Sequence, residues 1–151
     1  MTAIPVLLFM SMTFSAPAQS VPAAAKTKAP AAVEASLKRQ FPAAEVKTVS
    51  KEKENGQTTY EIETINAGHG LDLVFLPNGT LVESEEELTQ DQVPGVVEKA
   101  VLARYAKATV GKREKLTIAK SGEVRYELAL KGAPVKEVAL SPTGAWISPK
   151  R

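Results

Sequence analysis

Apolar residues recur at every fourth position in two stretches of the chain. The stripe positions are Val33, Leu37 and Phe41 in the first stretch and Val97, Val101 and Tyr105 in the second. A spacing of four places each set on one face of a helix. Pro30 and Pro94 precede the stripes, where proline is tolerated because its missing N–H would have no helical partner. The pattern predicts two short amphipathic helices, with Pro42 ending the first and Asp91 capping the second.

Each predicted helix is followed by segments in which apolar and polar residues alternate, as in half-buried strands. The alternation puts Tyr60 and Ile62 on one face and Glu61 and Glu63 on the other, and Asn55-Gly56 is a strong hairpin signal. Arg125 and Glu127 are expected to point outward in the same way. The strands are expected at residues 46–53, 58–65, 71–75 and 80–83, and again at 116–118, 124–130, 138–140 and 145–147.

The two stretches are copies of one unit. Tyr60-Glu61-Ile62 is repeated as Tyr126-Glu127-Leu128, and the turn Pro77-Asn78-Gly79 as Pro142-Thr143-Gly144. A unit of about sixty residues is marginal alone, so two copies are expected to bury their apolar faces together. The prediction is an α+β fold of two tandem αβββ(β) repeats, residues 30–88 and 89–151. Both helices are expected on one face of a shared or abutting antiparallel sheet.

Residues 1–29 are expected to lie outside the fold. Residues 3–14 are mostly apolar and are followed by the small residues Ala16-Pro17-Ala18, the pattern of a signal peptide over residues 1–18. No Lys or Arg precedes the apolar run, and a buried first helix is the alternative, which Pro5 weakens. Residues 19–29 form an Ala-, Pro- and Lys-rich linker. The prediction is a periplasmic or secreted protein with no stable membrane insertion after signal removal.

Charge divides the two repeats. Residues 30–88 carry five Lys/Arg against eleven Asp/Glu, net −6, and residues 89–151 carry twelve against six, net +6. The net charge of +2 for the whole chain hides this polarity. One interpretation is that the two halves attract each other and pack. The other is head-to-tail self-association or docking onto charged partners.

The sequence offers no catalytic, cofactor-binding or metal-binding set. The chain has no cysteine, and its single histidine, His69, lies between glycines, where an exposed loop residue is expected. Glu61, Glu63 and Asp72 could meet on neighbouring strands, but the spacing of a calcium loop is absent, so a solvated sheet face is expected. A hydrolase would require serines or aspartates near His69. The basic residues lack interleaved aromatics, so no nucleic-acid binding is expected.

Residues 30–147 resemble the PepSY-like, β-lactamase-inhibitor-like family of exported bacterial proteins. The likeness rests on the helix ending in Phe41-Pro42, on the two Tyr-Glu strands, and on the turns at Pro77-Asn78-Gly79 and Pro142-Thr143-Gly144. It implies an α+β fold, a periplasmic or secreted location, and a role in binding or inhibiting other proteins, with no catalytic residues. Ala106 replaces the proline of the first copy, so the second helix is expected to run slightly longer.

The functional hypothesis is therefore an exported, non-enzymatic protein-binding module, inhibitory toward an envelope or secreted enzyme. The alternative is a structural accessory protein that forms homo-oligomers through contacts between its acidic and basic halves. No cofactor is expected, and the partner is an unidentified protein of the periplasm or the exterior. The candidate partner-binding residues are Glu61, Glu63, Arg125, Glu127, Lys112, Arg113, Lys115 and Trp146.

Overall fold

The computed structural model describes residues 27–54 and 56–150. The predicted signal peptide and most of the predicted linker lie outside these residues. The first unit contains α1 (Ala31–Gln40), β1 (Glu45–Glu54), β2 (Gln57–Asn66), β3 (His69–Phe75) and β4 (Leu81–Glu87). After the 3-10 turn η1 (Gln90–Gln92), the second unit contains α2 (Gly95–Arg104), β5 (Thr109–Ile118), β6 (Glu123–Lys131), β7 (Glu137–Leu140) and β8 (Trp146–Lys150).

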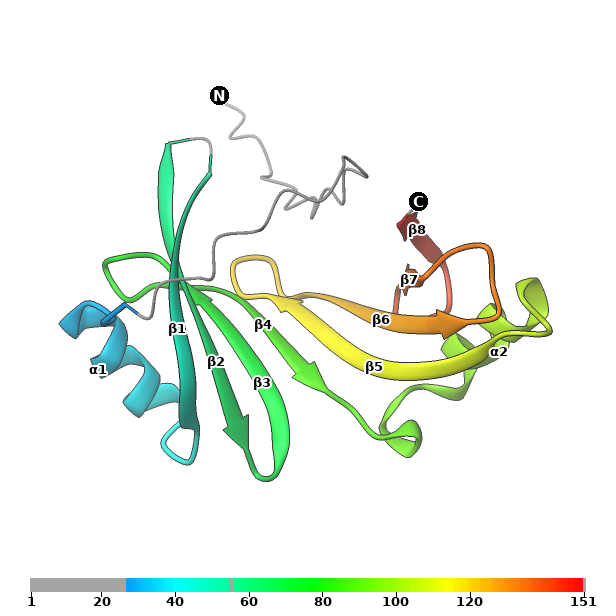
Figure 1. Cartoon of the computed structure of the whole chain (residues 1–151), viewed down its shortest axis with the longest axis horizontal. Coiled ribbons are helices and arrows are strands. Elements are labelled where there is room, and N and C mark those ends of the chain that lie inside the picture. The colour runs from blue at the N-terminus through cyan, green and yellow to red at the C-terminus, as the bar shows by residue number, and fades with distance from the viewer. Residues whose placement is uncertain (1–26, 55, 151) are drawn as a thin grey trace.

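The eight strands form one antiparallel sheet whose spatial order is the order of the chain. The α+β prediction with two tandem repeats is confirmed, and the sheet is shared by both units through the pairing of β4 with β5 (Figure 1). This pairing also explains why β4 extends to Glu87, whereas a strand over residues 80–83 was predicted. The acidic residues of β4 have little strand propensity, and they are held extended by hydrogen bonding to β5 on one side and β3 on the other.

Two apolar clusters form the core, one in each unit. The first contains Val33 and Leu37 of α1 with sheet residues of β2 and β3, and the second contains Val97 and Val101 of α2 with sheet residues of β6 and β7. The strand register relates the two. Leu73 pairs with Ser84, Ser84 with Thr117, and Thr117 with Val124, and residues paired across strands share a face. Leu128 lies four residues beyond Val124, on the same side of its strand. The sheet residues of both clusters therefore share one face.

Both helices have ten residues, so the expectation that Ala106 would lengthen the second is wrong. The helices end at equivalent aromatic residues, because Phe41 (φ −131°, ψ 64°) and Tyr105 (φ −127°, ψ 64°) leave helical geometry and pack against the core. Asp91 does not cap α2: it lies in η1, and Pro94 precedes α2 without a side-chain cap. In the described part of the chain, neither helix is long and apolar enough to span a bilayer.

The repeated Pro-x-Gly turns rest against the helices. Gly79 has φ +83°, and a Cβ atom there would lie 2.4 Å from the carbonyl oxygen of Ala32, in the first turn of α1. Gly144 has φ +80°, and its Cβ would lie 3.0 Å from the carbonyl oxygen of Val96, in the first turn of α2. Glycine is required for both the left-handed backbone and the close approach. The turn is repeated in the sequence because, in both units, it packs closely against the first turn of the helix.

Candidate protein-interaction surface

A group of acidic side chains lies on the side of the sheet opposite the two cores. Along each strand the side chains alternate, so Glu61 and Glu63 point away from Ile62, and the register continues the row because Glu63 pairs with Asp72 and Asp72 with Glu85. We call this surface the carboxylate face. It includes Glu61, Glu63, Asp72, Glu85, Glu114 and Glu127, and Glu83 and Glu87 lie on the same side of β4 as Glu85.

These carboxyl groups are crowded and partly withdrawn from water. Burial raises the pKa of Glu85 to about 8, and the neighbouring carboxylate of Glu114 adds to the shift. Burial also raises the pKa of Asp72, with a further contribution from Glu63, and burial followed by the charge of Glu52 raises the pKa of Glu61. Like charges placed opposite one another on neighbouring strands are destabilising. The face therefore carries negative charge at a cost to the stability of the fold.

Few positive groups oppose this charge among the described residues. The Lys112 ammonium forms an ion pair with Glu114, which raises the pKa of Lys112. Arg125 pairs with Glu123 at the edge of the group, with 2.9 Å between Nε and Oε1. The Ser50 hydroxyl donates to Glu61 over 3.3 Å. The net charge of the face remains negative.

Glu127 is more buried than the sequence pattern indicated. Its side chain was expected to point outward from the sheet, but the residue is only 7% exposed. Glu127 lies on an inner strand, opposite Glu114 on one side and Ala139 on the other, and Leu116 on the neighbouring strand is also buried. The expectation of a fully solvated outer face is therefore wrong for this part of the sheet.

The eight predicted partner-binding residues fall on two sides of the sheet. Five of them lie on the carboxylate face: Glu61, Glu63, Arg125, Glu127 and Lys112. The other three lie on the side of the sheet that carries the apolar clusters. Arg113 Nε is 2.6 Å from Glu98 Oε1 on α2, Lys115 Nζ is 2.7 Å from Glu86 Oε2, and Trp146 packs in the second core.

Trp146 is part of an aromatic cluster at the end of α2. Its ring meets Tyr105 edge-on at 6.0 Å between centroids, and the Arg104 guanidinium lies 4.8 Å from the Trp146 centroid. The expectation that Trp146 is half-buried is confirmed. Tyr60 and Tyr126 also pack against their cores, as expected. The position of Trp146 makes it a structural residue of the second unit and a fluorescent reporter for it.

Three acidic residues of the carboxylate face, Asp72, Glu85 and Glu114, were not among the eight predicted partner-binding residues, although Asp72 was expected to lie near Glu61 and Glu63. The alternate spacing of Glu83, Glu85 and Glu87 is visible in the sequence, and it is typical of one face of a strand. What the sequence does not show is that β4 pairs with β5, which brings Glu114 beside Glu85. In the sequence, Glu114 is surrounded by lysine and arginine and so belongs to a basic cluster.

No group of three or more His, Cys, Asp or Glu residues in the described part of the chain is arranged to hold a metal ion. His69 was expected in an exposed loop, but it is the first residue of β3, pairs with Asn66 and is half-buried. The turn before it needs only Ala67 and Gly68, both with positive φ, so the strand begins earlier than the glycines suggested.

The shifted pKa of Glu85 predicts an unusual dependence of stability on pH. Because the folded-state pKa, about 8, exceeds the unfolded value of 4.5, the folded state binds the proton more tightly, and stability is lost as the pH rises from about 4.5 to 8. The variant Glu85→Gln is expected to raise the free energy of unfolding at pH 8.5 by about 1–2 kcal/mol and to change it little at pH 5. Urea unfolding at the two pH values measures this.

The exposed Glu63 on the same face provides the control, because Glu63→Gln is expected to have a smaller effect at both pH values. Equal stabilisation by Glu85→Gln at pH 5 and pH 8.5 would show that the carboxyl group is not protonated in the folded protein.

Comparison with known proteins places this architecture in a family. The model of the family described as "Putative beta-lactamase-inhibitor-like, PepSY-like" matches twice, over residues 15–83 and 75–147. The two matches correspond to the two units and together cover most of the chain. The protein belongs to the PepSY-like family. No functionally curated protein matches the sequence.

Solved structures share the fold at low sequence identity. A "putative periplasmic" protein from Bacteroides eggerthii has a TM-score of 0.67 and 20% identity, covering 81% of this chain and 88% of its own. A DUF2874 family protein from Bacteroides uniformis has a TM-score of 0.66 and 23% identity, with 80% and 88% covered. A BLIP-like protein from Bacteroides fragilis has a TM-score of 0.64 and 18% identity, with 81% and 85% covered. These likenesses describe the fold.

Proposed function

We propose that the protein is an exported, non-enzymatic module that binds another protein through the carboxylate face. The single observation that carries this is the row of partly buried carboxylates whose pKa values are raised. A charge arrangement that costs stability in the free protein is typical of a functional surface, because a partner can supply the missing opposite charge. The partner is therefore expected to present lysine or arginine side chains.

The placement of the helices supports the proposal. Val33 of α1 and Val97 of α2 lie in clusters whose sheet residues share one face. We infer that both helices cover that face and that the carboxylate face is left uncovered for a partner. Such a sheet is open on one side, as antiparallel sheets commonly are.

The location and the inhibitory role come from the relatives. The Bacteroides eggerthii protein is described as "putative periplasmic", and the Bacteroides fragilis protein as BLIP-like. Together with the family description, these support a periplasmic or secreted protein that inhibits an envelope or secreted enzyme. Self-association through charge is less favoured, because Lys115 of β5 already pairs with Glu86 of β4 within the chain. The acidic and basic halves thus meet inside one molecule.

The test compares the protein with a variant of the carboxylate face. Glu61→Gln, Glu63→Gln and Asp72→Asn together remove three charges without changing side-chain size. Proteins captured from a bacterial envelope extract by the original chain are purified, and their affinity for both forms is measured by calorimetry. The triple variant is expected to bind at least about tenfold more weakly at low salt, with a smaller difference at about 0.5 M salt.

Lys107→Glu serves as the control, because Lys107 is exposed in the turn after α2. If the captured protein is an enzyme, its turnover is measured with and without each variant. A captured protein that binds the triple variant as tightly as the original chain would exclude the carboxylate face as the binding surface.

A further inference from the structure

Within the part of the chain that the structure describes, the first strand of the sheet has one edge without a neighbouring strand. β1 pairs with β2 on one side, and among the described residues no strand pairs with its other side (Figure 1). The backbone N–H of Thr27 donates to the carbonyl oxygen of Val49 over 3.2 Å, so the backbone groups of Val49 point to this edge. Alternate residues of an antiparallel strand point the same way, so Lys51 and Lys53 also direct their N–H and C=O groups to the edge.

The second unit shows what covers the equivalent edge. β5 is the counterpart of β1, and the offset that relates the two helix stripes places Arg113 and Lys115 in the positions of Val49 and Lys51. The edge of β5 is occupied by β4, which runs antiparallel to it. Glu86 of β4 lies opposite Lys115 and forms an ion pair with it, with 2.7 Å between Oε2 and Nζ. The second unit therefore carries an acidic strand at the place where no described strand lies beside β1 in the first unit.

The residue that follows this strand fills the core of the second unit. The N–H of Leu88 donates to the carbonyl oxygen of Arg113 over 2.8 Å, and the Leu88 side chain is buried in the second cluster with Val93. In the first unit, Thr27 makes the equivalent hydrogen bond to Val49. Ala29 takes the place of Val93 when the two copies are aligned on their helix stripes. Two smaller side chains thus stand where the second unit has leucine and valine.

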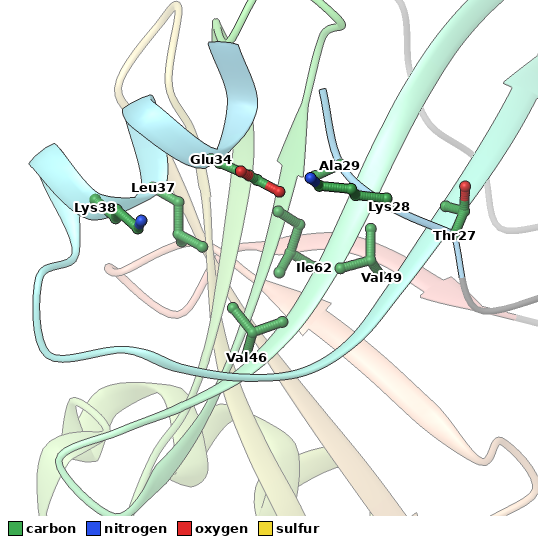
Figure 2. Close-up of a pocket in the computed structure, with 9 residues that line it drawn as sticks. All are labelled: Thr27, Lys28, Ala29, Glu34, Leu37, Lys38, Val46, Val49 and Ile62. Atoms are coloured by element: carbon green, nitrogen blue, oxygen red, sulfur yellow. The ribbon is translucent and has the colours of Figure 1, made fainter. Parts of the chain in front are cut away.

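A hollow remains in the first unit at this place. It has a volume of about 470 Å³ and opens between α1 and β1 (Figure 2). Its apolar wall is formed by Leu37, Val46, Val49 and Ile62, with Lys28, Glu34 and Lys38 also lining it. Val46 is 48% exposed, so its side chain is accessible from the solvent side of the hollow. The volume is sufficient for a large apolar side chain.

We propose that the free edge of β1 and this hollow together bind an extended acidic segment of a partner protein. The segment adds as a strand antiparallel to β1, with a carboxylate opposite Lys51. Two residues further along, a large apolar side chain enters the hollow, and the backbone N–H of the same residue replaces the N–H of Thr27 as the donor to the carbonyl oxygen of Val49. The sequence Glu86-Glu87-Leu88, which makes these contacts with β5, is the template for the segment.

The occupant is a different protein and not a second copy of this chain. The template residues Glu86 and Leu88 are already engaged within the chain. The free edge at the other end of the sheet belongs to β8, which contains Pro149 and so lacks one backbone donor. The sequence of β8 contains Lys150 and no acidic residue, so it offers no carboxylate for Lys51. A strand of that composition does not fit the β1 edge.

This site goes beyond the proposed function and is separate from it. The carboxylate face binds a basic partner on the flat of the sheet, whereas the β1 edge takes an acidic strand in the plane of the sheet. Removing the carboxylates of Glu61, Glu63 and Asp72 is expected to leave binding at the edge unchanged. Failure of one proposal therefore does not affect the other.

The test uses a fluorescently labelled synthetic peptide with the sequence of residues 81–88, LVESEEEL, titrated with the purified full chain. Saturable binding is expected at low salt. A peptide with alanine in place of Leu88 is expected to bind about tenfold more weakly or worse, since it leaves the hollow unfilled. Lys51→Glu in the protein is expected to weaken binding of the original peptide, and a Glu86→Lys peptide is expected to restore binding to that variant.

Two further variants complete the test. Lys53→Pro removes an N–H that points to the free edge without removing a hydrogen bond to β2, so it is expected to abolish binding. Lys107→Glu, far from the edge, is the control. Absence of saturable peptide binding, or binding that is the same for Lys51→Glu and Lys107→Glu, would overturn the proposal. A protein dimer that Lys53→Pro dissociates would also overturn it, because the occupant would then be a second copy.

Discussion

Replacement of Gly79 by alanine is expected to lower the free energy of unfolding by about 4 kcal/mol, near the whole stability of a small domain. The new methyl group would lie 2.4 Å from the carbonyl oxygen of Ala32, which is backbone and cannot rotate away. The left-handed φ of +83° adds about 1–2 kcal/mol of strain for any residue with a Cβ. Guanidinium unfolding followed by circular dichroism measures the change.

Gly56 is the matched control for this substitution. Its φ of +82° is almost the same, but a Cβ atom there has no neighbour within 4 Å. Gly56→Ala is therefore expected to cost about 1–2 kcal/mol, from backbone strain alone. Equal losses for the two variants would mean that the contact between the Pro-x-Gly turn and α1 contributes nothing to stability.

Truncation of Phe75 to alanine is expected to lower the free energy of unfolding by about 3–5 kcal/mol. The Phe75 side chain is fully buried in the first core, between α1 and the sheet, so its removal leaves a cavity. Because β4 and β5 join the two units in one sheet, unfolding is expected to remain a single transition. Fluorescence of Trp146, in the second unit, and circular dichroism of the whole chain are expected to report the same shifted midpoint.

Val74→Ala serves as the control, because Val74 is half-buried on the opposite side of the strand and is expected to cost less. Trp146 fluorescence that keeps its original midpoint while circular dichroism shifts would show that the two units unfold separately. The pairing of β4 with β5 would then be too weak to make the two units unfold together.

The parts of the fold that depend on local patterns could be predicted from the sequence. The stripe of Val33, Leu37 and Phe41 places the first helix within a residue of its observed ends, because burial of one face fixes the period. The alternation around Ile62 likewise identifies which side chains face the core. The helix stripe and the strand alternation both follow from burying one face of an element against the core of its own unit.

The parts of the fold that depend on pairing between the two units could not be predicted from the sequence. β5 begins at Thr109, well before the predicted segment at 116–118, because a bulge between Val110 and Arg113 interrupts its alternation. An equivalent bulge lies between Val46 and Thr48 in β1. The pairing of β4 with β5 sets the environment of Glu85, and nothing in the local sequence records it.

Some positions in the candidate site could also be predicted from local patterns, whereas others could not. Glu61 and Glu63 could be assigned to an outward face from alternation alone. The side of the sheet on which Lys115 lies could not be predicted, because its ion pair with Glu86 depends on the pairing of β5 with β4. The neighbours of the buried Glu127, which are Glu114 and Ala139, are likewise set by the strand register. Charge patterning thus identified the acidic and basic segments but not the face on which each side chain lies.

The order of the strands in the sheet has a consequence for biosynthesis. Every strand pairs only with the strands before and after it in the chain, so no pairing has to wait for a distant segment. A polypeptide that emerges with its N-terminus first can therefore add each strand to a growing sheet as it appears, and the loops to be closed are short. We expect the first unit to acquire its core while the second is still being delivered. Each new strand would then cover the edge left by the one before it.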